Sequence, residues 1–196
     1  MTPEIRAFEY ALGLYSVLIG LAIADIAGSF HRLARSGTPV KWHPLPLLAA
    51  AYAFCMAVGM WFEVWTIRNV AEARHYLFYL TMIGNFFVLF LIAAASLPDD
   101  PARDSDLEAY YQRNRRYFWS LVVLFEIVYI AQGVYFVHSI FSRMPTDVRV
   151  AFLSQWALLL FVPLAMAFSR SKLLQYVGFG ILFAVQTWHY LAYAIN

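Results

Sequence analysis

Charged residues and cysteine are scarce in this chain of 196 residues. Only 13% of the residues are charged, and Cys55 is the one cysteine. A soluble domain carries about a quarter charged residues, so too few polar side chains remain to cover a water-facing surface. A single cysteine excludes an internal disulfide and any metal site built from several cysteines. The net charge of +2 gives no indication of nucleic-acid binding.

Known catalytic motifs are missing as well. The sequence contains no HExxH, GxSxG, P-loop or GxGxxG motif, and no histidine cluster like that of membrane di-iron oxygenases. We therefore predict that the chain is not an enzyme, and we assign it no catalytic residue, no metal and no cofactor.

Apolar residues are abundant instead, at 62% of the chain, and 18% of the residues are aromatic. They form six continuous apolar runs, each about as long as the roughly 20 residues with which a helix crosses a bilayer. Lipid offers no partner to an unpaired backbone amide, so such runs must be helical. We predict an all-α polytopic protein with one transmembrane domain over 1–196 and the lipid bilayer as its partner. The six spans are 8–30, 45–67, 76–97, 117–141, 150–168 and 173–195.

The links between these spans are short, so adjacent spans should run antiparallel. The longest link contains Ser105 followed by Glu108, the pattern of a helix capping box. Leu107, Tyr110 and Tyr111 then fall on one side of a helix. This pattern predicts a short amphipathic helix over 106–116 on the membrane surface, with a solvated loop as the alternative.

An internal repeat is a second prediction for the chain. A shift of 107 residues aligns His31 with His138 and Asp25 with Gln132, and three spans lie on either side of the long link. Three is odd, so the second half would be inverted relative to the first, as in many transporters. Two unrelated three-helix units would also look somewhat alike.

Polar and ionisable residues within the spans are the candidate functional residues, because each costs a few kcal/mol to insert into lipid. Asn85 and Gln155 are neutral companions of this set. The residues that we assign to a proton or cation pathway are Asp25, Glu63, Glu126, Gln132, His138, Gln186 and His189.

Asp25 and Glu126 form the predicted centre of this pathway. Counted from the same membrane face, Asp25 lies about 9 Å deep in the first span and Glu126 about 14 Å deep in the fourth. Two such carboxylates in a low dielectric would share a proton or bind a cation. In the alternative, Asp25 pairs with Arg32 or Arg35 and Glu126 is neutral and hydrogen-bonded.

Glu63, His138 and His189 form a second group near the opposite face. Histidine and carboxylate are ligands for zinc, and imidazole also binds haem iron or relays protons. No two of these histidines have close metal-ligand spacing in one helix. A hydrated vestibule is therefore favoured over a metal or haem site.

Small residues recur at every fourth position of the first span, at Ser16, Gly20, Ala24 and Gly28. Such a stripe lets another helix approach closely. It predicts either a contact within the chain or a homo-oligomer through the first helix.

The topology follows from the basic residues, of which nine lie on the side of the long third link and five on the side of both termini. The positive-inside rule therefore places both termini outside and the long third link in the cytoplasm.

Two segments carry a resemblance to a known group of proteins. Residues 20–48 (GLAIADIAGSFHRLARSGTPVKWHPLPLL) and 94–119 (AASLPDDPARDSDLEAYYQRNRRYFW) resemble an uncharacterised family of bacterial six-helix membrane proteins. The resemblance covers about a quarter of the chain. It implies a bacterial inner (cytoplasmic) membrane and no particular activity.

These observations favour a small membrane channel or transporter for protons, a cation or a small solute. One alternative is an accessory or scaffold membrane protein whose polar residues only hold helices together. A less favoured one is a membrane protein with a histidine-ligated haem or metal.

Overall fold

Six long helices make up the computed structural model, which describes residues 3–66, 76–136 and 142–194, with side chains for 11–64, 76–135 and 142–188. In the described links between the helices, Lys41 and Asp106 form a single isolated β-bridge. The helices are α1 (Pro3–Ala34), α2 (Pro44–Thr66), α3 (Tyr76–Ser96), α4 (Leu107–Phe136), α6 (Thr146–Phe168) and α7 (Lys172–Ala194).

Proline marks several helix starts. Pro3 and Pro44 are the first residues of α1 and α2, and Pro145 directly precedes α6. Proline suits the first turn of a helix because its fixed φ is already helical and its missing N–H would have no partner there. Pro163 lies inside α6, which continues as one helix to Phe168.

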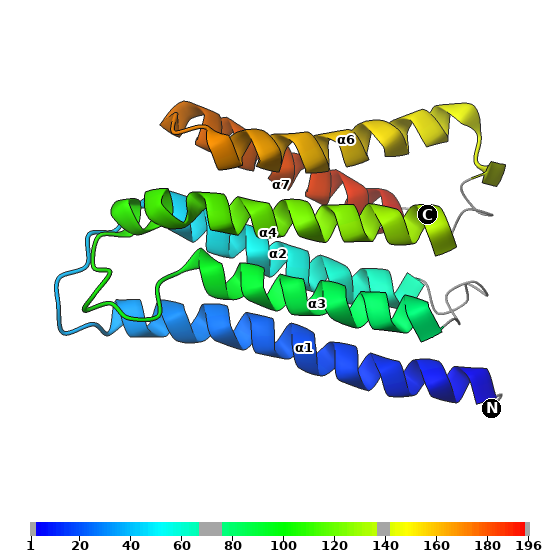
Figure 1. Cartoon of the computed structure of the whole chain (residues 1–196), viewed down its shortest axis with the longest axis horizontal. Coiled ribbons are helices and arrows are strands. Elements are labelled where there is room, and N and C mark those ends of the chain that lie inside the picture. The colour runs from blue at the N-terminus through cyan, green and yellow to red at the C-terminus, as the bar shows by residue number, and fades with distance from the viewer. Residues whose placement is uncertain (1–2, 67–75, 137–141, 195–196) are drawn as a thin grey trace.

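Consecutive helices run antiparallel, as predicted, in an elongated bundle (Figure 1). We call the end where α1 finishes and α2 begins the link end; the links 35–43, 97–106 and 169–171 lie there. The opposite end, where α1 begins and α7 finishes, is the termini end. α3 packs against α1 on one side and α4 on the other, and α4 packs in turn against α6.

Within the residues that the structure describes, five helices are long and apolar enough to cross a membrane, namely α1, α2, α3, α4 and α6. Large apolar side chains cover the outside of the bundle, where a soluble protein would carry charge. Phe161 is 62% exposed and Phe168 68% exposed on α6, and Val17 is 57% exposed on α1. The chain is therefore a helical membrane protein.

The α1–α3 half and the α4–α7 half differ in their packing. The backbone of α1 lies close to both α2 and α3, whereas the backbone of α4 lies close to α6 and meets α7 mainly through long side chains such as Trp119. The inverted repeat therefore gains no support from the helix neighbours and stays a prediction.

The predicted surface helix over 106–116 is helical, but it is not a separate element lying on the membrane. Residues 107–136 form one uninterrupted helix, α4, and Figure 1 shows no bend at its start. The side chains of Leu107, Tyr111 and Arg115 are buried, with exposed fractions of 0%, 3% and 2%. This face of the helix therefore packs inside the bundle, which explains its apolar pattern.

The predicted capping box is also wrong by one residue. Asp106, not Ser105, caps α4, since its Oδ1 accepts a hydrogen bond of 3.0 Å from the N–H of Ala109. Glu108 does not reach back to the cap. Its carboxylate pairs with Lys172 Nζ at 2.5 Å and ties the start of α7 to the start of α4.

Candidate functional site

A partly open cavity of about 100 Å³ lies among α2, α4, α6 and α7, and we call it the acidic cavity. Its volume exceeds the roughly 10–15 Å³ that one water molecule needs in such a measure. It is lined by Tyr52, Met56, Met60, Glu63, Phe125, Glu126, Tyr129, Phe152, Gln155, Trp156, Leu159 and Gln186.

Helical spacing brings these side chains to one place. On α2, Tyr52, Met56 and Met60 follow one another at four-residue intervals, and Glu63 comes three residues later. Residues three and four apart share a helix face, so α2 presents a single mixed face to the cavity. α6 does the same with Phe152, Gln155, Trp156 and Leu159.

Glu126 is the most deeply placed polar group of the cavity. Its side chain is only 5% exposed, and it has no hydrogen-bond or ion-pair partner among the residues that the structure describes. A buried carboxylate is costly unless a proton, a cation or hydrogen bonds compensate its charge. Glu126 is thus a binding group that the described part of the protein does not satisfy.

Three more polar side chains reach the cavity from other helices. Glu63 comes from α2, Gln155 from α6 and Gln186 from α7. The Oε1 atom of Gln186 is buried and accepts no hydrogen bond from any described residue. The cavity therefore combines two carboxyl groups with two amides, all from separate helices.

Aromatic rings form much of the remaining wall. Phe125 and Tyr129 on α4 stack with a centroid distance of 6.4 Å and an interplanar angle of 4°. Phe152 and Trp156 on α6 meet edge to face at 6.2 Å. Tyr52 adds a fifth ring from α2.

The predicted pairing of Asp25 with Glu126 is wrong. Asp25 does not line the acidic cavity, and α1 lies on the far side of α3 from α4 (Figure 1). Their depths differ too. Leu33 and Leu107 belong to one small apolar cluster at the link end and so mark the same depth in α1 and α4. At a rise of 1.5 Å per residue, Asp25 lies about 12 Å from this depth and Glu126 about 28 Å from it. The error arose because α4 begins ten residues before the predicted span.

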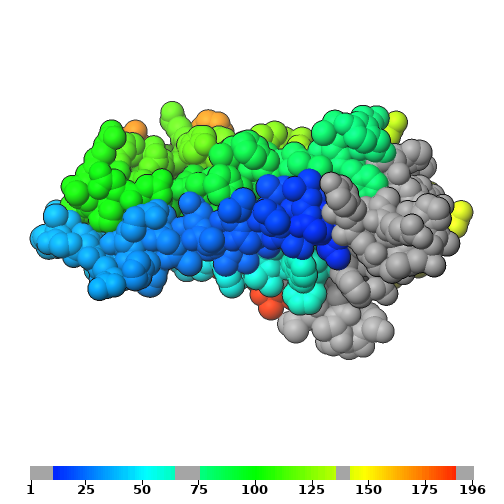
Figure 2. Space-filling view, turned by 90° about the horizontal axis from the view of Figure 1, so that it is seen from below, coloured from blue at the N-terminus to red at the C-terminus, as the bar shows by residue number. Residues whose placement is uncertain are grey.

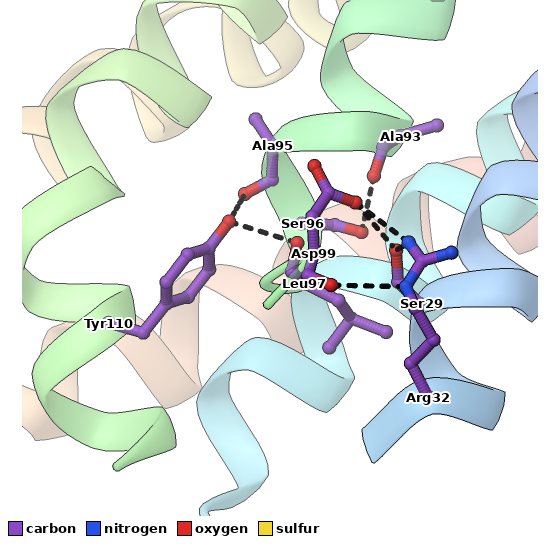
Figure 3. A network of polar contacts seen from close by, with 8 residues as sticks. All are labelled: Ser29, Arg32, Ala93, Ala95, Ser96, Leu97, Asp99 and Tyr110. Carbon is purple, nitrogen blue, oxygen red and sulfur yellow. Dashed lines mark hydrogen bonds and ion pairs between the residues drawn. The ribbon is translucent and has the colours of Figure 1, made fainter. Parts of the chain in front are cut away.

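Asp25 lies near a polar network that closes the link end, shown in Figure 3. Asp99 Oδ1 accepts hydrogen bonds from Arg32 Nη2 at 2.8 Å and from Ser29 Oγ at 3.2 Å. The Arg32 Nε–H also donates to the Asp99 carbonyl. Arg32 is thus paired with Asp99, not with Asp25 as the alternative reading predicted, and this network ties α1 to the link after α3.

Tyr110 closes the end of α3 from the neighbouring helix. Its hydroxyl lies within hydrogen-bond distance of the carbonyls of Ala95 and Leu97, at 3.2 and 3.0 Å (Figure 3). The last carbonyls of a helix have no partner within that helix. Tyr110 therefore has a structural role.

A second buried network joins α4 to α7. Tyr111 donates to Gln175 Oε1 at 2.6 Å and accepts from Trp119 Nε1 at 3.0 Å. Gln175 Nε2 donates to the carbonyls of Met166 and Ser169, at the end of α6. Every side-chain group of this set has a partner, so it also holds helices together.

Of the remaining predicted pathway residues, the one whose side chain is described does not line the cavity. Gln132 is buried on α4, 5% exposed, but it does not line the cavity, and neither does Asn85 on α3. His138 lies outside the described residues, and His189 lies on α7 where the side chains are not described. Among the described residues, no group of three metal-ligating side chains comes together.

The small-residue stripe of α1 is not used for packing within the described bundle. Gly20 and Ala24 are exposed, and a Cβ added at Gly20 would meet no atom within 4 Å. Figure 2 shows that one face of α1, from dark to light blue, is not covered by another described helix. Tyr15, Ile19 and Ala22 form its buried face instead. The homo-oligomer through this stripe stays a prediction.

The aromatic and methionine residues of the cavity were not predicted as site residues. Their composition alone is that of an ordinary apolar core, so no single residue identifies them. The signal that could have found them is their position beside a polar residue on the same side of a helix. Phe152 and Trp156 lie beside Gln155 in this way, and Phe125 and Tyr129 lie beside Glu126.

Neither a protein-family model, nor a curated protein, nor a solved structure matches the chain significantly. The functional argument therefore depends on the geometry of the cavity.

Proposed function

We propose that the chain is a small membrane transporter or channel for protons or a small cation, with Glu126 as its central binding group. The observation that carries this proposal is the burial of Glu126 in a cavity that it shares with Glu63. A carboxyl group buried this deeply cannot stay ionised without a cation to compensate its charge, and otherwise it takes up a proton. Uptake and release of that positive charge is the step that a transporter needs.

The neutral groups of the cavity support the same function. Gln155 and Gln186 supply amide oxygens, which coordinate cations or hydrogen-bond to a proton donor. Ionisable residues that face the interior of a membrane bundle are a recognised mark of ion and substrate pathways.

In this proposal the chain crosses the membrane six times, with α7 as the sixth span. Both termini lie outside and the link end faces the cytoplasm of a bacterial inner membrane. The support for this orientation is the excess of basic residues at the link end, such as Arg32, Arg35 and Lys172. The acidic cavity then lies in the outer half of the bilayer, and the exposed stripe of α1 faces a second copy.

A flux measurement tests the proposal. The purified chain is reconstituted into liposomes that contain a pH-sensitive dye, and an inward gradient of K⁺ or Na⁺ is imposed. We expect a change of internal pH that is absent from empty liposomes and from liposomes with Glu126→Gln.

Asp25→Asn is the matched control, because it removes a carboxylate within a span that does not line the cavity. We expect this variant to keep the flux of the unaltered protein. Equal flux in Glu126→Gln and in the unaltered protein would rule out the proposed role of Glu126. Flux no greater than in empty liposomes would favour an accessory role, which the paired polar groups of the link end already suit.

A further inference from the structure

The acidic cavity has features that a site for a bare metal ion or a proton does not need. Five aromatic rings line it in addition to the two carboxyl groups, and they come from α2, α4 and α6. A small inorganic cation keeps its affinity for oxygen ligands and gains little from apolar walls. The aromatic lining therefore calls for a ligand with its own apolar surface.

Aromatic faces attract cations whose charge is spread over carbon-bound hydrogens. The ring quadrupole is negative on its face, and boxes of aromatic rings are the usual recognition device for quaternary ammonium groups. Trp156 offers the strongest such face, and it adjoins Phe152 at 6.2 Å. Tyr129 and Phe125, stacked at 6.4 Å, provide a second aromatic wall from α4.

The carboxylate of Glu126 supplies the counter-charge for such a ligand. Glu126 is only 5% exposed, and it has no hydrogen-bond or ion-pair partner among the described residues. A cation that enters the cavity would neutralise it without forming the strict coordination shell that a metal ion demands. Met56 and Met60 add polarizable, adaptable side chains to the same wall, and methionine suits irregular apolar ligands.

From this arrangement we infer that the acidic cavity binds a small organic cation, of the quaternary or fully alkylated ammonium class. The aromatic rings around Trp156 hold its alkyl groups, and Glu126 balances its charge. This inference rests on the proposed function, for which it names the substrate class. The cavity volume of about 100 Å³ limits the ligand to a small head group.

Calorimetric titration of the full chain in detergent micelles tests the inference with two matched probes. Choline carries a trimethylammonium group, and 3,3-dimethylbutan-1-ol is its neutral isostere with the same shape. We expect choline to bind and the isostere to bind at least about tenfold more weakly, because cation–π and ionic attraction both need the charge.

Variants separate the two parts of the site. Glu126→Gln and Trp156→Leu should each weaken choline binding about tenfold or more. Trp156→Phe, which keeps a ring, should recover most of the loss, and Asp25→Asn should change the affinity less than about twofold. Thermal unfolding identifies any variant that fails to fold. If Trp156→Leu does not fold, the affinities of Glu126→Gln for choline and of the unaltered protein for the isostere decide the question.

Each result of these titrations decides for or against the inference. Equal binding of the isostere, unchanged affinity in Glu126→Gln, or no choline binding would overturn it. Flux of K⁺ or Na⁺ that depends on Glu126, without choline binding, would overturn the inference and leave the proposed function intact. Loss of both flux and binding in the unaltered protein would overturn both.

Discussion

Two polar networks towards the link end differ from the Glu126 and Gln186 side chains of the acidic cavity in how fully their polar groups are paired. At the link end, the Arg32–Asp99–Ser29 and Trp119–Tyr111–Gln175 networks give each polar side chain a partner at 2.6 to 3.2 Å. In the cavity, Glu126 has no described partner and the Gln186 Oε1 atom is unpaired. The difference indicates that the first region holds the bundle together and that the second is built to receive a ligand.

This difference can be read as a division between stability and function. A satisfied buried network stabilises a fold, and its loss leaves costly unpaired groups. An unsatisfied buried charge lowers stability and is kept only where it serves another purpose. Substitutions in the two regions should therefore affect different measurements.

The largest expected loss of stability is that of Trp119→Ala. Trp119 is fully buried and contacts Phe118 and Phe179 at centroid distances of 4.9 and 5.2 Å. Truncating a buried aromatic residue costs about 3 to 5 kcal/mol of unfolding free energy. The control is Trp188→Ala, since Trp188 is 74% exposed on the outside of α7. Equal thermal unfolding midpoints of the two variants would contradict the assignment of the core.

Gly178→Ala should be the next most damaging change. A Cβ at Gly178 would overlap Met166 Sδ, and Met166 is itself fully buried. Overpacking of this kind costs about 1 to 3 kcal/mol. Gly180→Ala on the same helix meets no atom within 4 Å, so its thermal midpoint in detergent should stay level or rise. A fall in Gly180→Ala as large as in Gly178→Ala would argue against this close approach of α6 and α7.

Tyr111→Phe should lower stability by about 1 to 3 kcal/mol, because it leaves two buried groups without a partner. These groups are Gln175 Oε1 and Trp119 Nε1. Ion flux per folded molecule should not change, since Tyr111 does not line the acidic cavity. Tyr117→Phe is a control on the exposed side of α4, where Tyr117 is 53% exposed. Reduced flux at unchanged stability in Tyr111→Phe would contradict the assignment of Tyr111 to a purely structural role.

The smallest effect concerns the cap of α4 and depends on pH. The Ala109 N–H and, to a lesser extent, Lys41 hold the pKa of Asp106 below its ordinary value. The folded-state pKa is thus lower than the unfolded one, so the stabilisation is complete above the unfolded pKa of about 4. It is lost as the pH falls through the folded pKa. The thermal midpoint of Asp106→Asn should differ from that of the unaltered protein at pH 6 and approach it at pH 3. A difference between the two midpoints that stays constant from pH 6 to pH 3 would show that ionisation of Asp106 does not contribute to the cap of α4.

Much of the fold could be predicted from the sequence, because lipid imposes helices of known length. The starts of α2, α3 and α7 fall within one residue of the predictions. α4 was placed wrongly because the charged stretch before Tyr117 reads as surface, although Leu107, Tyr111 and Arg115 are buried there. The charge on Arg115 hides the fact that its Nη1 donates to Gln112 within the same helix.

The site was predicted only in part for a related reason. Glu63, Glu126 and Gln186 were selected as polar residues within the spans, and all three line one cavity, although only Glu126 is buried. Asp25 was selected by the same rule, yet it lies on α1, which has no contact with the cavity. The free-energy cost of placing a polar residue in lipid identifies candidate residues from the sequence alone. Which of these residues come together depends on how the helices are arranged in space.

The most direct test of the account compares Glu126→Gln with Tyr111→Phe in two measurements on the same preparations, the thermal unfolding midpoint and the cation-driven pH change in liposomes. We predict that Glu126→Gln loses the flux while its midpoint is unchanged or higher, and that Tyr111→Phe keeps the flux while its midpoint falls. A Glu126→Gln protein that unfolds earlier and still carries the full flux would contradict the account.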